Sequence, residues 1–353
     1  MKSLLKVAVN LRKKHTLKAP DRRYILPSWL ICHVGNAKWK PKLIYSEWKL
    51  KTPVVLIIFN RPDTTERVFA EIAKAKPSIL LVVADGPRAD RSDDVEKCAK
   101  TRAVVDRVDW DCKLYTNYSS VNLGSRNRVS SGLDWVFEQV EEAIILEDDC
   151  LPHPTFFRFC QELLERFREN DRIFMVSGRN GLGEWKSSKY SYFFSAGGTW
   201  GWATWRRAWQ HFDVDLKLWS DEQAQKKMKA FFKGDAVAIK VIRKGCERVF
   251  SGKVDTWDYQ WSFIRAVNHG MSVNPSVNLI ANIGFGEDAT HTKTYDTRFA
   301  DVKVGAIEFP LKHNNNISLD LRYYRKIKMP SREKLQLRLK RYLKKLLRWV
   351  IVP

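Results

Sequence analysis

The 353-residue sequence lacks three features that would each assign it to a familiar class of protein. It has no apolar run of about 18 residues, so we expect no membrane-spanning helix. Its opening stretch, MKSLLKVAVNLRKK, has too short an apolar core for a signal peptide. Its six cysteines form no C-x-x-C pair, which argues against a zinc module or a disulfide framework. We therefore expect a cytoplasmic protein in a reducing compartment.

The charge is one-sided, with 62 Lys and Arg against 40 Asp and Glu and a net charge of +22. The excess lies at the two ends: residues 1–51 carry 13 basic and 2 acidic residues, and residues 331–353 carry 8 and 1. A membrane surface or a nucleic acid is the expected partner of such ends. Residues 331–353 place apolar side chains along one helical stripe among Lys and Arg, as in-plane membrane anchors do. The alternative is a terminal helix packed on its own domain.

Apolar runs alternate with amphipathic stretches in the first half of the chain. The runs are 53–59 (PVVLIIF), 78–87 (SILLVVADGP) and 143–146 (AIIL), and the helical patterns are 60–75 and 129–142. This alternation predicts an α/β fold with a mainly parallel central sheet. Such sheets bind ligands at the carboxyl ends of their strands. The polar residues Asn60, Arg61 and Asp85 and the triplet 147–149 (EDD) all follow apolar runs.

The chain divides by composition into a core domain and two basic ends. We predict a basic extension over 1–51, a domain over 52–310, a linker over 311–330 and a basic amphipathic helix over 331–353. Within the domain, the half 52–178 contains the apolar runs, and the half 179–310 is rich in aromatic residues and Gly.

Three adjacent carboxylates, Glu147, Asp148 and Asp149, follow the third apolar run. They repel one another, and a divalent cation such as Mn²⁺ or Mg²⁺ relieves the repulsion because it prefers oxygen ligands. Successive residues of a straight strand point to opposite faces, so we expect Asp148 and Asp149 to have different roles. The alternative is an acidic turn that caps the following helix.

The stretch LEDDCLPHPTFFRF (146–159) resembles the metal-binding motif of glycosyltransferases with the GT-A fold. It is most similar to the E-D-D form of N-acetylglucosaminyltransferase I-like enzymes and of bacterial family-2-like sugar transferases. Further segments resemble this family in the same order: 122–138 (N-x-G, then W-x-F-E), 197–209 (GGTWGWATWRRAW), 255–261 (DTWDYQW) and 282–292 (NIGFGEDATHT). The resemblance covers about 53–295 and implies a GT-A (Rossmann-like) nucleotide-diphospho-sugar transferase fold. It also implies that 52–178 is the nucleotide-binding half of the domain and 179–310 the acceptor half.

The resemblance also implies roles for individual residues. Asp149 would contact the metal, Asp148 the ribose or a metal-bound water, and Glu147 would support the loop. Asn60, Arg61 and Asp85 would surround the nucleotide base. Arg128 would lie near the diphosphate, with Arg126 and Lys113 as rivals. His291 would be a further metal ligand, with Asp288 as a rival, and Asp258 would be the general base.

The residues around Asp258 suit that chemistry without the resemblance. An acceptor hydroxyl must lose a proton to a carboxylate within reach, and a departing diphosphate gains charge that a cation stabilises. Asp258 lies between Trp257 and Tyr259, and aromatic faces are platforms for sugar rings. The alternative is that 255–261 belongs to an ordinary amphipathic helix with Asp258 exposed.

These features predict an inverting, metal-dependent glycosyltransferase. Its donor would be a nucleotide sugar, UDP-linked in the first instance, and its acceptor a glycan or lipid-linked glycan. It would act peripherally at the inner face of the membrane in lipopolysaccharide or surface-polysaccharide synthesis. A sugar-nucleotide nucleotidyltransferase is a second reading, but such enzymes open with a Gly-rich loop where this chain has FNRPDTTER. A basic nucleic-acid-binding protein is the third, although no nucleic-acid motif is present, so we expect no specific nucleic-acid partner.

Overall fold

The structure is a computed structural model that describes residues 48–186, 188–285 and 302–328. The predictions for 1–47, His291, Asp288 and 331–353 therefore lie outside the described residues. None of the helices in the described ranges is long and apolar enough to cross a membrane.

An eight-stranded mixed sheet with the strand order β3-β2-β1-β4-β8-β6-β9-β7 forms the centre of the fold. One half is parallel and contains β1 (Val54–Ile58), β2 (Ile79–Ala84), β3 (Lys113–Tyr118) and β4 (Glu142–Glu147). Every residue of β1 is buried, as its unbroken apolar run predicts for a central strand. The predicted α/β fold class with a mainly parallel sheet is confirmed.

The other half of the sheet contains the antiparallel pairings. It consists of β6 (Ile173–Ser177), β7 (Tyr192–Ser195), β8 (Trp202–Trp205) and β9 (Met271–Pro275). β8 runs antiparallel to both β4 and β6, and β7 runs antiparallel to β9. β7 and β8 have only four residues each and lie inside one aromatic-rich stretch, so no local apolar run marks them as strands. A separate two-stranded sheet pairs β5 (Cys150–Pro152) with β10 (Ile280–Asn282).

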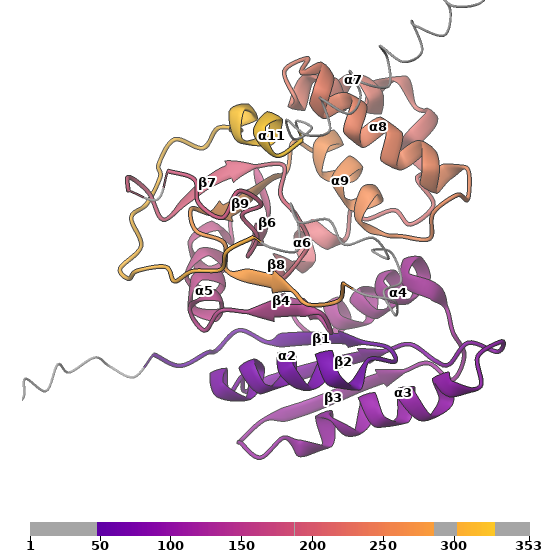
Figure 1. Cartoon of the computed structure of the whole chain (residues 1–353). Helices are drawn as coiled ribbons and strands as arrows, with labels where there is room; N and C mark the ends of the chain where they lie inside the picture. The colour runs from indigo at the N-terminus through magenta and orange to yellow at the C-terminus, as the bar shows by residue number, and fades with distance from the viewer. Residues whose placement is uncertain (1–47, 187, 286–301, 329–353) are drawn as a thin grey trace, which may run out of the picture. The chain divides into compact units, whose positions relative to one another are not determined.

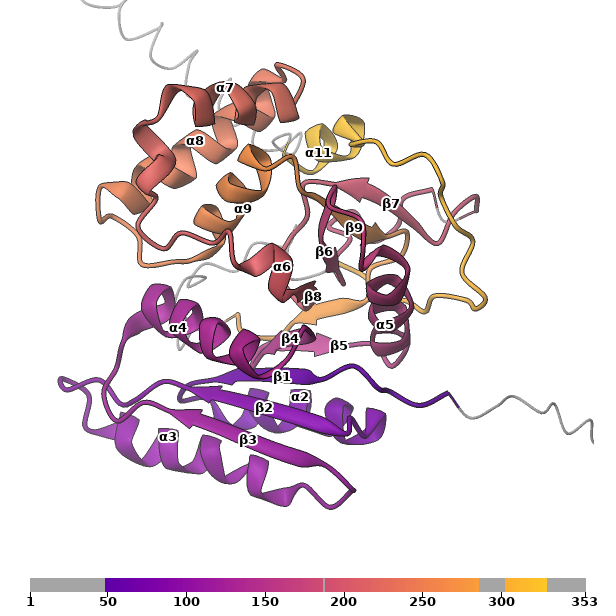
Figure 2. The ribbon, with the colours of Figure 1, turned by 180° about the vertical axis from the view of Figure 1, so that it is seen from behind.

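Helices cover both faces of the parallel half. α2 (Pro62–Ala75) packs on β1 and on α3 (Asp93–Ala103), and α4 (Gly124–Gln139) lies on the opposite face of the sheet from α2 (Figures 1 and 2). α4 begins five residues before the predicted helix 129–142, and Glu142 already belongs to β4. The α5 helix (Thr155–Phe167) contacts β4, β6 and β8 and matches the predicted helix after the EDD triplet.

A second helical group adjoins the antiparallel half of the sheet (Figure 1). It contains α6 (Arg206–Trp209), α7 (Glu222–Phe231), α8 (Ala236–Phe250), α9 (Asp258–Val267) and α11 (Leu321–Lys328). Short 3-10 helices cover Val105–Arg107 (η2) and Lys217–Ser220 (η3).

The segment 311–330, expected to be a linker, contains the helix α11. Tyr323 and Tyr324 are buried, and α11 contacts α8 and β7. Arg325 on α11 forms an ion pair with the buried Asp235 at the start of α8. Polar composition suggested a linker because most of the polar residues face outward, whereas two tyrosines and two ion pairs, Arg325–Asp235 and Lys186–Asp320, attach the segment to the domain.

Candidate active site

Three neighbouring strands bring the predicted polar residues to one edge of the sheet. Residues after β1, β2 and β4 line a cavity of about 280 Å³, here called the strand-end cavity. Its wall includes Arg61, Asp85, Arg128 and the triplet 147–149. The order β2-β1-β4 explains the meeting, because the carboxyl ends of adjacent parallel strands share one edge.

Arg61 makes an ion pair with two carboxylates of the EDD triplet. Its Nε donates to Asp148 Oδ2 at 3.3 Å, its Nη2 to Asp148 Oδ1, and its Nη1 to Asp149 Oδ2 at 3.1 Å. A straight strand would send Asp148 and Asp149 to opposite faces, but here both bind the Arg61 side chain. β4 ends at Glu147 and the chain turns, so both carboxylates reach the same guanidinium.

Burial and the repulsion between neighbouring charges raise the pKa values of Glu147 and Asp148. Burial raises the pKa of Asp148, and the Arg61 charge opposes that rise. Burial, together with the nearby charges of Asp149, Asp148 and Asp258, raises the pKa of Glu147 to about 8. Carboxyl groups whose pKa values are raised in this way are typical of a site that binds a cation or moves a proton.

The triplet does not cap the helix that follows it. The N-cap position of α5 is Pro154, and no side chain accepts a hydrogen bond there. The strand β5 separates the triplet from the helix and pairs with β10. β10 leads to Gly284, where a Cβ would overlap the Asp149 carboxylate and the Arg61 guanidinium. The backbone therefore closes directly over this ion pair, and the acidic-cap alternative is excluded.

Asp85 lies in the strand-end cavity but serves the backbone. Its carboxylate accepts hydrogen bonds from the amides of Gly86 (2.9 Å), Leu123 (2.9 Å) and Gly124 (3.1 Å) and from Asn122 Nδ2 (3.0 Å). It thereby fixes the loop that begins α4. Burial raises the pKa of Asp85, and these backbone amides oppose the rise.

Asn60 connects the end of β1 to α3. Its Nδ2 donates to Asp94 Oδ1 at 2.7 Å, and Asp94 also binds Arg88. The Arg88 guanidinium lies 5.4 Å from the Phe59 ring centroid and lines the strand-end cavity. Arg88 was not predicted, because its position depends on the loop after β2.

Of the three basic candidates for the diphosphate, the structure brings Arg128 into the cavity. Arg128 is buried and donates to the carbonyl of Ala84 at 3.0 Å and to Asn117 Oδ1 at 2.7 Å. Burial lowers its pKa. Arg126 instead pairs with Asp215 at 2.9 Å. Lys113 begins β3 and pairs in register with Ile79, at the opposite end of the strands.

Asp258 is the first residue of α9 and lines a second cavity of about 500 Å³, here called the junction cavity. Glu147 lines the same cavity. Asp258 Oδ1 accepts a hydrogen bond from Thr256 Oγ1 at 2.6 Å, which fixes the carboxylate. The predicted base and the predicted metal motif therefore share one wall. Asp258 is therefore not an exposed carboxylate on an ordinary amphipathic helix.

Buried tryptophans position the loop that carries Asp258. Trp257 stacks on Trp202 of β8 with ring centroids 5.5 Å apart, and Trp261 of α9 lies 5.9 Å from Trp202. Just before β8, Gly201 has φ +57, and a Cβ there would overlap Ile280. This glycine turns the chain so that Trp200 borders the cavities while Trp202 enters the core.

Two residues of the junction were missed from the sequence. Asp255 lines both the strand-end and junction cavities and accepts a hydrogen bond from the Arg126 amide at 3.3 Å. Trp200 lines these two cavities and a third one. Both residues fall inside segments that the resemblance covered. The pattern D-x-x-D over 255–258 is the signal that would have found Asp255.

The triplet offers the oxygen donors that Mn²⁺ and Mg²⁺ prefer. Within the described ranges, no three His, Cys, Asp or Glu side chains are grouped as a metal site. Asp148 and Asp149 supply two adjacent carboxylates, and Gly284 gives close approach beside Asp149. The residues present thus fit a cation bound by one or two carboxylates and completed by a ligand phosphate, as Mg²⁺ commonly is.

No family model matches the chain, and no curated protein matches it. Among solved structures it is similar to the mannosyltransferase PcManGT from Pyrobaculum calidifontis in complex with GDP-Man and Mn²⁺, with 14% identity over 53% of this chain and 54% of that chain and a TM-score of 0.35. It is also similar to UDP-glucose pyrophosphorylase complexed with UDP-glucose, with 7% identity over 65% of this chain and 91% of that chain and a TM-score of 0.33. A third similar structure is mouse xyloside xylosyltransferase 1 in its apo form, with 9% identity over 62% of this chain and 82% of that chain and a TM-score of 0.29. Likenesses this distant add nothing to what the residues of the site indicate.

Proposed function

We propose that this chain is a glycosyltransferase that uses a nucleotide-diphosphate sugar and a divalent cation. The observation that carries the proposal is the junction cavity, whose wall contains both Glu147 of the acidic triplet and Asp258. The strand-end cavity beside it would hold the nucleotide diphosphate, and the junction cavity would hold the transferred sugar. This layout would put a donor and a carboxylate base on either side of one reaction centre.

The residues divide the chemistry between them. Asp258 would take the proton of the acceptor hydroxyl, with its carboxylate oriented by Thr256. Asp149 and Asp148 would hold the cation, which would stabilise the charge that develops on the departing diphosphate. Arg61 Nη1 lies 3.1 Å from Asp149 Oδ2, and the guanidinium would hold these two carboxylates in place. Attack from the side of Asp258 would invert the anomeric configuration, and a product with the configuration of the donor would contradict this.

The first experiment is a thermal-shift series with nucleotide sugars, UDP-linked ones first, with and without Mn²⁺. A ligand at about 100 times its Kd stabilises the folded state by about 2.7 kcal/mol. We expect stabilisation that requires both metal and nucleotide, that is lost in Asp149→Ala and that persists in Asp258→Asn. Asp258→Asn should lower the transfer rate by about 10²- to 10⁴-fold without weakening donor binding. Equal loss of donor binding in both variants would contradict the separate roles.

The same reaction mixtures distinguish a transferase from a nucleotidyltransferase. A transferase releases the nucleoside diphosphate as it glycosylates the acceptor. A nucleotidyltransferase, given the nucleotide sugar and pyrophosphate, releases the nucleoside triphosphate and a sugar 1-phosphate. The stretch FNRPDTTER, which follows β1 and enters α2, contains no glycine for a phosphate cradle, and this favours the transferase.

We also propose that the acceptor is a glycan or lipid-linked glycan reached at an anionic membrane surface, in the synthesis of lipopolysaccharide or a similar surface polysaccharide. The support is the charge of the ends, above all the 8 basic residues against 1 acid in 331–353. Co-sedimentation with anionic vesicles should fall when residues 331–353 are deleted. Neutral vesicles provide the control. Unchanged binding after the deletion would remove this part of the proposal.

A further inference from the structure

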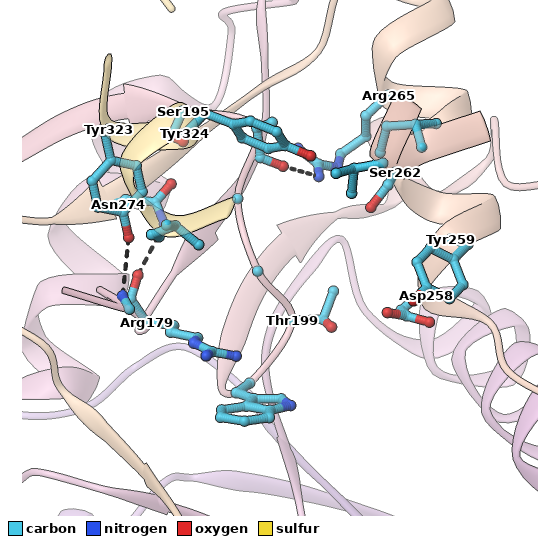
Figure 3. A pocket seen from close by; sticks show the side chains of 18 of the residues that line it. Arg179, Ser195, Thr199, Asp258, Tyr259, Ser262, Arg265, Asn274, Tyr323 and Tyr324 are labelled. Carbon is cyan, nitrogen blue, oxygen red and sulfur yellow. Dashed lines mark hydrogen bonds between the residues drawn. The ribbon is translucent and has the colours of Figure 1, made fainter. Parts of the chain in front are cut away.

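A third cavity, of about 330 Å³, opens beside Asp258 and is here called the arginine cavity (Figure 3). It shares Thr199, Trp200, Asp258 and Tyr259 with the junction cavity. Its remaining wall comes from β7, β9, α7, α8, α9 and α11 and from the loop after β6. It is therefore continuous with the proposed reaction centre, on the side away from the strand ends.

Two arginines line this cavity, and Asp258 is the one acid among its described lining residues. Arg265, on α9, is 2% exposed and donates to the Ala196 carbonyl through Nη2. Arg179, after β6, has its guanidinium carbon 3.6 Å from the Trp200 ring centroid. Figure 3 shows the Arg179 side chain extending from the side of Asn274 toward Thr199. The wall thus carries more positive than negative charge.

Several polar groups of this wall are buried without a partner in the described part of the chain. They are Arg265 Nε and Nη1, Asn274 Oδ1 and Ser195 Oγ. Arg265 forms no ion pair with any described acid, and burial lowers its pKa to about 10, so the guanidinium stays charged at neutral pH. A buried charge without a counter-charge is costly, and such a group is commonly retained for a ligand.

Aromatic side chains complete the cavity. Tyr323 and Tyr324 come from α11, and Tyr323 Oη accepts a hydrogen bond from the Gly181 amide at 3.0 Å. Phe231, Phe232 and Tyr259 add further rings. Aromatic faces bind the apolar faces of sugar rings, whereas guanidinium groups bind carboxylate or phosphate oxygens.

We propose that the arginine cavity is the acceptor site and that it selects a sugar bearing a carboxylate or phosphate group. The assignment of this cavity as an acceptor site rests on the proposed function, whereas the preference for an anionic sugar does not depend on it. Arg265 and Arg179 supply the positive charge, Asn274 and Ser195 supply hydrogen bonds, and Asp258 at the mouth faces the hydroxyl that reacts.

The test measures sugar binding to the full chain without any donor, by ligand-observed NMR titration. The probes are methyl β-D-glucuronide, glucose 6-phosphate and the neutral methyl β-D-glucoside. We expect at least one anionic probe to bind about tenfold more tightly than the neutral one, as one charge-assisted contact allows. Preference for the glucuronide alone identifies a carboxylate site, and preference for the phosphate alone identifies a phosphate site. Equal affinity for all three overturns the proposal.

Substitutions of Arg265 test whether this residue causes the preference for an anionic sugar. Arg265→Gln should remove most of it, and Arg265→Lys should restore part of it. Arg107→Gln makes the same change in net charge on the exposed η2 helix and should leave it intact. A folded Arg265→Gln protein that keeps the full preference would show that Arg265 only supports the Ala196 carbonyl. If Arg265→Gln does not fold, the probe comparison on the unaltered chain still decides. Failure of nucleotide-sugar binding in the thermal-shift series, with the anionic preference present, would overturn the proposed function and leave the anion site standing.

Discussion

Replacing Arg61 with Met is the sharpest test of the ion pair at the strand ends. The substitution keeps the length of the side chain and removes the charge that Asp148 and Asp149 share. Asp148 is 4% exposed at its side chain, and Arg61 is 20% exposed. Removing one partner of a buried pair costs about 3 to 5 kcal/mol, and the partial exposure of Arg61 places this case at about 3 kcal/mol.

The cost should depend on pH, and its sign follows from Asp148. Burial already raises the pKa of this carboxyl in the folded protein, and loss of the Arg61 charge raises it further. Between the unfolded and folded pKa values the folded state then binds more protons, so its stability falls as pH rises. The deficit of Arg61→Met should therefore be larger at pH 7.5 than at pH 5.

Urea unfolding followed by far-ultraviolet circular dichroism measures this deficit. The matched control is Arg107→Met, which breaks an exposed pair with Glu66 in which the side chains are 52% and 58% exposed. That control should cost about 0.5 kcal/mol. Mn²⁺ should recover part of the Arg61→Met deficit, because a cation at the triplet replaces the lost charge. A loss no larger than that of the control, or a deficit that grows toward pH 5, would refute the reasoning.

Two further substitutions test the surroundings of the site. Gly284→Ala places a Cβ where the Asp149 carboxylate lies. Calorimetric titration should therefore show that the nucleotide binds about tenfold more weakly, or weaker still, in the presence of Mn²⁺. Unchanged affinity would count against the cation site. Asp235→Ala removes both the cap of α8 and the ion pair to Arg325, so it should destabilise the protein by about 2 kcal/mol, against about 1 kcal/mol for Asp221→Ala, which removes only the cap of α7. The cap hydrogen bond and Arg325 lower the pKa of Asp235, so the contribution of Asp235 to stability should be lost as pH falls through that lowered pKa. Equal losses of stability in Asp235→Ala and Asp221→Ala would show that the ion pair does not hold α11.

The polar edge strand β3 was not predicted, whereas β1, β2 and β4 were predictable because each is a local apolar run followed by polar residues. The strand-end cavity followed from this, since topology alone brings Asp85 and the EDD triplet to one edge. The contact between Arg61 and both aspartates was not predictable, because it depends on the chain turning after Glu147.

The antiparallel half and its cavity escaped prediction for a different reason. The arginine cavity assembles residues that are far apart in the chain, such as Arg179, Arg265 and Tyr323. No local pattern marks any of them as neighbours. The buried tyrosines of α11 were likewise hidden in a polar stretch, because two buried residues per helix leave little periodicity to detect.

Trp200 borders the strand-end, junction and arginine cavities alike. A side chain that forms part of all three walls cannot move for one occupant without changing the shape offered to the others. Binding at the two ends of the site should therefore be thermodynamically linked, and by reciprocity the factor by which a nucleotide sugar changes the affinity for an anionic sugar equals the factor in the other direction. Such linkage would favour an ordered sequence of binding, in which the first substrate sets the rotamer of Trp200 and thereby prepares the cavity for the second.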